Sequence, residues 1–228
     1  MDAISLVLAD SRFPGGGHVH SGGLEEVVAR KLLTAEHELP GFLHGRLWTA
    51  GMLAAVFAAA SAHAAARKVH RQHWATLDAE LDARTPSFAQ REASRAQGRG
   101  TARAGRIAWR SPVITDLLGV TPRPHHPVIT GALAGVAGGS PRDAALAVAY
   151  LAVSGPASAA VRLLGFDPLS VNAMVAGLAA ELETVAERAA AVAGSDPAGL
   201  PGPSAPALDL FAEAHLRHHK EEVRLFAS

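Results

Sequence analysis

Long apolar segments follow one another along the chain with short polar interruptions between them. None of these segments shows the sustained alternation of apolar and polar residues that is typical of a half-buried β-strand. No strand–helix–strand rhythm appears either, which argues against a Rossmann or P-loop fold. The pattern therefore predicts an all-α protein.

Two kinds of signal mark the helix boundaries. A capping side chain directly before a proline favours a helix start, because the cap satisfies a free N–H and proline has none to satisfy. Glycines stand where several helices should end. The capped pairs are Thr85-Pro86, Ser111-Pro112, Ser140-Pro141 and Asp167-Pro168. The expected helices lie near residues 2–11, 24–34, 41–68, 70–83, 87–105, 112–118, 127–137, 141–164, 168–193 and 206–226.

The pattern predicts one domain over residues 1–228, a single-domain bundle of about ten helices. Residues 194–206, GSDPAGLPGPSAP, are rich in proline and glycine and predict a linker before the last helix. Residues 207–228 follow as the C-terminal helix and tail. The sequence leaves open whether this helix docks back onto the bundle or reaches a partner.

Composition narrows the classes of function. Hydrophobic residues make up 49% of the chain, mostly as alanine, which favours helices over strands. The 21 basic and 21 acidic residues cancel, so charge does not indicate a nucleic-acid partner. The lack of cysteine excludes disulfides, thiolate metal sites and cysteine nucleophiles. The N-terminus has no basic segment of the kind that begins a signal peptide, and we expect a cytoplasmic protein.

Two uncharged stretches, Trp48–Ala66 and Ala144–Val161, are long enough to cross a bilayer. Both consist mainly of alanine with Thr, Ser, Gly or His, and the second contains Gly155-Pro156. Membrane spans rely instead on Leu, Ile, Phe and Val. We therefore interpret both stretches as buried core helices and expect no membrane partner.

A glycine-rich segment, RFPGGGHVHSGGLE, occupies residues 12–25. It lacks the Gly-Lys-Ser/Thr of a P-loop and no strand precedes it, so phosphate binding is not indicated. Its glycines exceed what a turn between helices requires, and they allow the backbone to approach another surface closely. The candidates for partner contact are Gly15, Gly16, Gly17, His18 and His20, with a flexible turn as the alternative.

A polar helix near residues 87–105 carries Arg91, Arg95 and Arg99 at intervals of four, and Arg84 precedes it. This spacing predicts a basic strip on one face of the helix, which indicates contact with a partner protein. The alternatives are a solvated face with ion pairs to nearby acids, or a buried helix that is hydrogen-bonded between its neighbours.

The last predicted helix carries a stripe of possible metal ligands. His215, His218, His219 and Glu222 lie at i, i+3, i+4 and i+7, and imidazole with carboxylate is a ligand set for nickel or zinc. Leu216 stands where the zincin pattern requires glutamate, so hydrolase chemistry is not supported. A solvated polar face is the alternative interpretation, and the one that we favour.

No catalytic set is indicated elsewhere. His63, His70 and His73 would share a face only in one unbroken helix, and we expect a break near them. No Gly-x-Ser-x-Gly elbow is present. The neighbouring carboxylates Glu25 and Glu26 point apart on a helix, so they do not make an acid–base couple. We expect no enzyme activity.

These motifs, in this order, resemble the UreF family of urease accessory proteins. The resemblance covers nearly the whole chain, and the ordered set, more than any one motif, makes it specific. The matching segments are Asp10-Ser11-Arg12-Phe13-Pro14 with His20-Ser21-Gly22-Gly23-Leu24-Glu25, Arg84, Arg91-Glu92-Ala93-Ser94, Gln97-Gly98-Arg99, His126-Pro127-Val128, Gly131-Ala132, Ser158-Ala159-Ala160-Val161-Arg162-Leu163 and Arg224-Leu225-Phe226-Ala227-Ser228.

The resemblance implies an all-α homodimer that joins UreD (also called UreH) and the nickel-carrying GTPase UreG on apo-urease. It implies a scaffold for nickel insertion with no permanently bound cofactor, since nickel is handled by the complex. Arg162 and Arg224, which lie in matching segments, join the candidates for partner contact. The alternative function is a direct nickel carrier that uses the C-terminal histidine stripe.

Overall fold

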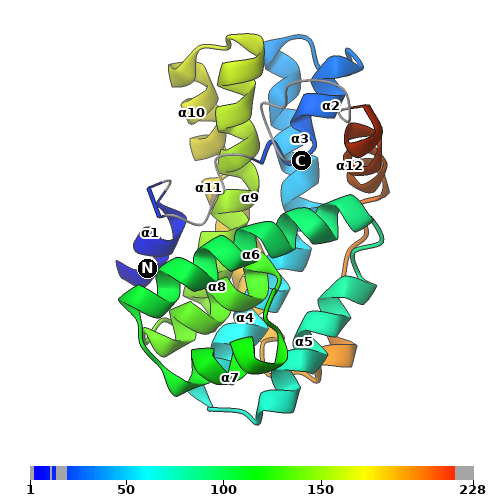
Figure 1. Ribbon diagram of the computed structural model, residues 1–228. Helices are drawn as coiled ribbons and strands as arrows, with labels where there is room; N and C mark the ends of the chain where they lie inside the picture. Colours follow the sequence, from blue (N-terminus) through cyan, green and yellow to red (C-terminus); the bar gives the residue numbers. More distant parts are fainter. Residues whose placement is uncertain (1–2, 11, 14–19, 219–228) are drawn as a thin grey trace.

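The computed structural model describes residues 3–10, 12–13 and 20–218, and these ranges contain helices and connections but no strand. Figure 1 shows the arrangement: the helical segments 36–66 and 141–164 run through the centre, the helix of residues 88–108 crosses in front of them, and shorter helices lie at both ends. The all-α fold class expected from the sequence is confirmed.

The helices follow the chain in the order α1 (Ala3–Ala9), α2 (Leu24–Ala29), the 3-10 turn η2 (Glu36–Glu38), α3 (Leu39–Arg46), the π-helical turn η3 (Leu47–Gly51), α4 (Met52–Ala66), α5 (Arg71–Ala83), α6 (Phe88–Ala108), α7 (Pro112–Val120), α8 (His126–Val136), α9 (Pro141–Leu164), α10 (Pro168–Gly177), α11 (Ala179–Ala191), the 3-10 turn η4 (Pro197–Gly199) and α12 (Pro206–His218).

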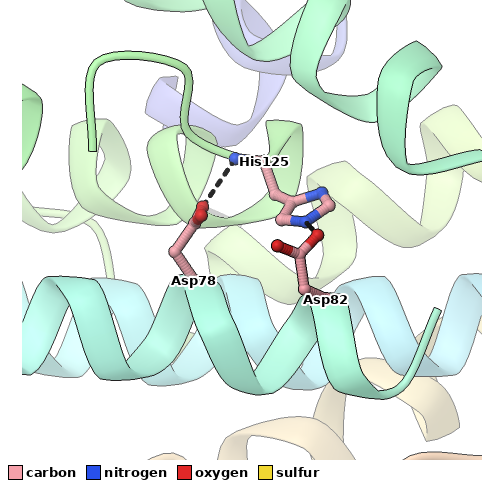
Figure 2. A group of neighbouring side chains, drawn as sticks. All are labelled: Asp78, Asp82 and His125. Atoms are coloured by element: carbon pink, nitrogen blue, oxygen red, sulfur yellow. Dashed lines mark hydrogen bonds and ion pairs between the residues drawn. The ribbon is translucent and has the colours of Figure 1, made fainter. Parts of the chain in front are cut away.

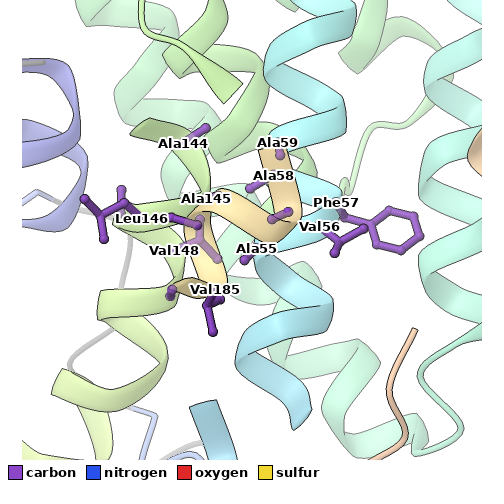
Figure 3. Close-up of a cluster of buried hydrophobic side chains, with 14 of the residues drawn as sticks. Ala55, Val56, Phe57, Ala58, Ala59, Ala144, Ala145, Leu146, Val148 and Val185 are labelled. Carbon is purple, nitrogen blue, oxygen red and sulfur yellow. The ribbon is translucent and has the colours of Figure 1, made fainter. Parts of the chain in front are cut away.

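The centre of the core is α4, which packs against α8, α9 and α11. Small buried side chains such as Ala58 line these contacts, as Figure 3 shows for the interface with α9 and α11. Against α8 the approach is so close that a Cβ at Gly131 would lie 2.1 Å from the carbonyl oxygen of Ala58, and one at Gly135 2.4 Å from that of Ala62. Glycine is required at both positions, because any side chain would push α8 away from α4.

Three helix boundaries differ from those expected. The helix expected over 41–68 starts earlier, since Glu36–Ala66 is one helical run that includes the π-helical turn η3. The helix expected over 24–34 ends at Ala29, and the chain turns at Lys31, whose φ is +57°. The helix expected over 168–193 is two helices bent by 44°, and the first ends at a glycine, a weak helix former.

Pro156 lies inside α9, and the helix continues through it. Proline has no N–H, so the carbonyl oxygen of Ala152, four residues earlier, loses its helical donor. The Nε of Arg46, at the end of α3, donates to that oxygen at 2.9 Å instead. A side chain from another helix therefore replaces the missing backbone hydrogen bond.

The predicted linker 194–206 lies on the surface of the bundle and includes η4. Arg84 holds it there by donating to the carbonyl oxygens of Ala198 and Leu200 at 2.8 and 3.1 Å. The chain then returns, and α12 packs against α6 and α2 (Figure 1). Of the two possibilities that the sequence leaves open, the described part of the last helix docks back onto the bundle.

Two helical segments, Glu36–Ala66 and Pro141–Leu164, have the length and apolar composition to cross a membrane, and the bent pair α10–α11 would make a third if it were one span. In the two long segments, 67% and 61% of the most apolar window is buried inside the protein. Packing in the core accounts for this apolar character.

Candidate functional site

A polar cluster joins α5, α6 and the connection that precedes α8. Asp78 and Asp82, one turn apart on α5, face His125 (Figure 2). The backbone N–H of His125 donates to Asp78 Oδ1 at 2.8 Å, and its Nε2 lies 2.8 Å from Asp82 Oδ1. Arg95 on α6 reaches both carboxylates, at 2.8 Å to Asp78 and 2.6 Å to Asp82.

Ser94 fixes the state of the His125 ring. Its hydroxyl oxygen accepts the backbone N–H of His126 at 3.2 Å and lies 3.0 Å from His125 Nδ1. Burial lowers the pKa of His125, so the ring is neutral at neutral pH. Nε2 then carries the proton and donates to Asp82, while Nδ1 accepts from the Ser94 hydroxyl. Both ring nitrogens therefore have partners within the cluster.

Asp78, Asp82 and His125 are also the one group of metal-ligand type within the described ranges, with ligand atoms within 4.8 Å of one another. Such a donor set suits a divalent cation by chemistry. Burial alone would raise the pKa of the Asp82 carboxyl, but hydrogen bonds from His125 and Arg95 outweigh it and lower that pKa. The guanidinium of Arg95 thus already supplies the positive charge, and the geometry favours a structural ion-pair cluster over a metal centre.

Gly98 brings α6 close enough to complete this cluster. A Cβ at this position would lie 1.9 Å from the carbonyl oxygen of Pro124 and 3.1 Å from the backbone of His125. The Gln97-Gly98-Arg99 motif therefore has a packing role: it lets the helix that carries Ser94 and Arg95 lie against the connection before α8.

The basic strip predicted for Arg91, Arg95 and Arg99 requires correction, because the three side chains do not form one exposed face. Arg95 is engaged in the cluster, with 16% of its side chain exposed. Arg91 donates at 2.7 and 2.8 Å to two carbonyl oxygens of the turn before α6. Arg99 is exposed, as is Arg162 on α9. The spacing placed the arginines on one side of the helix, but it could not show that the acids of α5 face that side.

Beside the cluster lies a cavity of about 870 Å³. Its polar lining includes His20, Arg46, Ser94, His126 and Asp209, among many apolar side chains. Burial lowers the pKa of His126 to about 4, so this imidazole is neutral at neutral pH. Burial also raises the pKa of Asp209. The cavity lining therefore combines the neutral imidazole of His126 with a carboxyl group whose pKa is raised by burial.

The glycine-rich segment reaches the cavity through its second half. His20 is buried and lines the cavity, and Gly22 and Gly23 have φ of +64° and +91°, which glycine adopts without strain. These two glycines are thus required by the backbone conformation. The other predicted contact residues of this segment, Gly15, Gly16, Gly17 and His18, lie outside the described residues.

The C-terminal histidine stripe is only partly described. His215 is buried, so the expectation of a solvated face is wrong at this residue, because α12 packs against α6 and α2. His218 ends α12. The side chain of His218 lies outside the described part of the chain, as do His219, Glu222 and Arg224. The stripe as a metal site stays a prediction.

The break expected near His63, His70 and His73 is confirmed, because α4 ends at Ala66 and α5 begins at Arg71. His70 caps α5, and its Nδ1 accepts the N–H of the residue two positions on, at 3.3 Å. His63 and His73 line a small second cavity of about 260 Å³ across this break. The three histidines do not form one helix face.

Asp78, His125, His126 and Arg46 contribute to the cluster and the cavity but are not among the site candidates predicted from the sequence. Asp78 and His125 lie in segments without a recognised pattern, and His126 belongs only to the family-like segment His126-Pro127-Val128, so their partners in space give these three residues their role. Arg46 carries a usable signal, because it directly precedes an apolar helical stretch without formal charge. An isolated charge beside such a core helix indicates a specific buried partner or ligand.

The fold and this geometry define a class: an all-α protein in which a closed polar cluster stands beside a large cavity. The sequence profile of the UreF family matches residues 33–179. The chain belongs to the UreF family of urease accessory proteins.

The chain is 46% identical to the urease accessory protein UreF of Mycobacterium sp. (strain JLS) over 98% of this chain and 97% of that relative. It is also 42% identical to the protein of that name from Mycobacterium bovis (strain BCG / Pasteur 1173P2), over 99% of this chain and 98% of that relative. The resemblance found in the sequence is therefore confirmed, and the relatives are named as accessory proteins rather than as enzymes.

Proposed function

We propose that this protein is a scaffold without catalytic activity that helps to insert nickel into apo-urease, in a complex with UreD (UreH) and UreG. Membership of the UreF family supports the accessory role. The observation that carries the nickel part is the cavity beside the polar cluster. Imidazole and carboxyl groups are ligand types that bind nickel, and His20, His126 and Asp209 bring both types to the cavity lining.

The character of the cavity suits passage better than storage. Its volume of about 870 Å³ is roughly thirty times the share of one water in the liquid, so a hydrated ion has room to move. A stored ion would need a closed set of three or four ligands at fixed distances. The candidate ligands His20, His126 and Asp209 come from three separate segments of the cavity lining, which favours brief contacts that an ion can leave. Nickel would then be the cargo of the complex and not a resident cofactor.

The contact with UreG would act by binding one nucleotide state of the GTPase more tightly than the other, since a scaffold shifts an equilibrium only by such a difference. Arg99 and Arg162 are the described members of the predicted contact set whose side chains are exposed on the surface. A homodimer of this chain would present two GTPases to each other. We expect no arginine finger from this protein.

The first test is assembly. The chain is co-expressed with the UreD-like and UreG-like proteins of its own source, and the mass of the purified species is measured by light scattering with and without a GTP analogue and nickel. A discrete complex with two copies of each protein supports the scaffold. A chain that ignores both partners but keeps stoichiometric nickel, and loses it when His218 and His219 become alanine, would replace the scaffold with the direct carrier.

The second test addresses the cavity. Ala54→Trp fills part of the lining, whereas Ala180→Trp places the same side chain on the exposed face of α11. With an assembled complex in both cases, we expect the nickel content of urease, measured by mass spectrometry of metals, to fall only for the first variant. Equal nickel content in the two variants would contradict passage through this cavity.

A further inference from the structure

Arg46 stands at the junction of three segments. It ends α3, it precedes the π-helical turn η3, and its side chain reaches α9 and the turn before α2. Its Nε donates to the carbonyl oxygen of Ala152 at 2.9 Å, and its Nη1 donates to that of Gly22 at 2.7 Å. These contacts fix the plane of the guanidinium, and Arg46 is among the residues that line the large cavity.

The charge of Arg46 has no counter-ion within the described ranges. A guanidinium has five N–H donors, and the two hydrogen bonds above use two of them. Both acceptors are uncharged, and no carboxylate of the described chain forms an ion pair with this side chain. Burial lowers the pKa of Arg46 to about 10, which still leaves it charged at neutral pH. A half-buried cation without a matching anion is costly, and a bound anion would offset that cost.

The surroundings are shaped around this side chain. A Cβ at Gly22 would lie 2.6 Å from the central carbon of the guanidinium, so only glycine leaves the space that Arg46 occupies. The π-helical turn η3 widens the helix directly after Arg46, and such turns are frequent at functional sites. Ala50, Leu53 and Ala54, on and after this turn, line the same cavity with small or apolar side chains. Apolar walls strengthen the attraction between a guanidinium and an anion.

We propose that the open edge of Arg46 binds a small carboxylate anion inside the cavity. Carboxylate matches the guanidinium because two parallel N–H groups can donate to its two oxygens, and three donors of Arg46 are available for this pairing. The cavity admits a free anion of a few heavy atoms. The bound species is a small molecule, and the site does not depend on nickel or on the scaffold function.

The test uses the whole chain with arginine labelled by ¹⁵N, and sodium formate as the probe. The Nε–H resonance of Arg46 is assigned by its loss in Arg46→Lys, and formate is titrated against sodium chloride at equal ionic strength. We expect a saturable shift of this resonance with formate only. An unmoved resonance, or an equal response to chloride, would overturn the proposal, and Arg46→Lys keeps a positive charge so that the variant used for the assignment folds.

Matched variants give a second readout. Arg46→Gln removes the fork, whereas Arg106→Gln removes an exposed arginine near the end of α6 that lines neither cavity. Formate is expected to raise the Tm of the wild type and of Arg106→Gln, and to bind Arg46→Gln at least about tenfold more weakly by calorimetry. The same affinity in Arg46→Gln as in the wild type would assign the binding to another place and refute the role of Arg46.

Discussion

Replacing Gly98 with alanine tests how closely α6 is held against the connection before α8. The new Cβ would lie 1.9 Å from the carbonyl oxygen of Pro124, whereas carbon atoms in proteins rest about 3.5 Å or more from their neighbours. The obstacle is backbone, so it cannot rotate away as the end of a side chain would. The helix must therefore retreat by more than about 1 Å.

The cost has three parts. Overpacking of this kind costs about 1–3 kcal/mol. The retreat also stretches the two hydrogen bonds of Ser94 to the backbone of His126 and to the His125 ring, each worth about 1 kcal/mol. Alanine returns about 1 kcal/mol through its better helix propensity. We expect a net loss of about 2–4 kcal/mol in the free energy of unfolding.

The assay is urea unfolding followed by circular dichroism, with linear extrapolation to water. Gly41→Ala is the matched control, because Gly41 lies in α3 and nothing stands within 4 Å of a Cβ built there. That variant is expected to gain up to about 1 kcal/mol. If Gly98→Ala unfolds at the same urea concentration as the wild type, α6 does not contact the connection as described and the reasoning is refuted.

Three further predictions concern the cluster, the cavity and a helix cap. Asp78→Ala leaves Arg95 without one of its two carboxylates and should lower the free energy of unfolding in urea by about 3 kcal/mol. Glu92→Ala removes the exposed ion pair with Arg123 and should lower it by less than about 1 kcal/mol. Equal losses in the two variants would contradict the burial of the cluster. The pKa of His126 is about 4, below the roughly 6.5 of an unfolded imidazole, so between these values the unfolded chain binds a proton that the folded protein does not. Stability therefore falls as the pH drops from about 6.5 to about 4, and His126→Gln should flatten this part of the Tm profile; an unchanged slope would argue against the neutral ring. Ser140→Ala removes the cap of α9 and should cost about 1 kcal/mol, an effect that Ser140→Gly should show only in small part.

The fold class and most helix starts could be predicted, because they depend on neighbours in the sequence. Ser111, Ser140 and Asp167 each cap the helix that the pattern assigned to them. Thr85 is not the cap of α6, because Ser87 takes that position. The hydroxyl of Thr85 instead donates to the carbonyl oxygen of Leu81 in the last turn of α5. A polar residue near a proline indicates that a helix begins, but local geometry decides which residue is the cap.

The cluster and the cavity could not be predicted, because their contacts join distant parts of the chain. His125 and Asp78 are 47 positions apart, and Arg46 and Ala152 are 106 apart. Spacing along one helix identified the face of Arg95 but gave no information about which helix covers that face. The resemblance to the UreF family indicated the role of the chain. The physical reason for motifs such as Gln97-Gly98-Arg99 lies in contacts between distant segments, which the sequence alone does not show.

The hydrogen bond from Arg46 to Ala152 constrains the order in which this chain could have acquired its residues. A proline at position 156 that arose before the arginine would have left a half-buried carbonyl oxygen without a donor in the protein, at a cost of up to about 1–3 kcal/mol. An arginine that arose first would have found that oxygen already occupied by a helical N–H. Each residue is thus better tolerated with the other present, and lineages should gain and lose Arg46 and Pro156 together, although they lie on different helices.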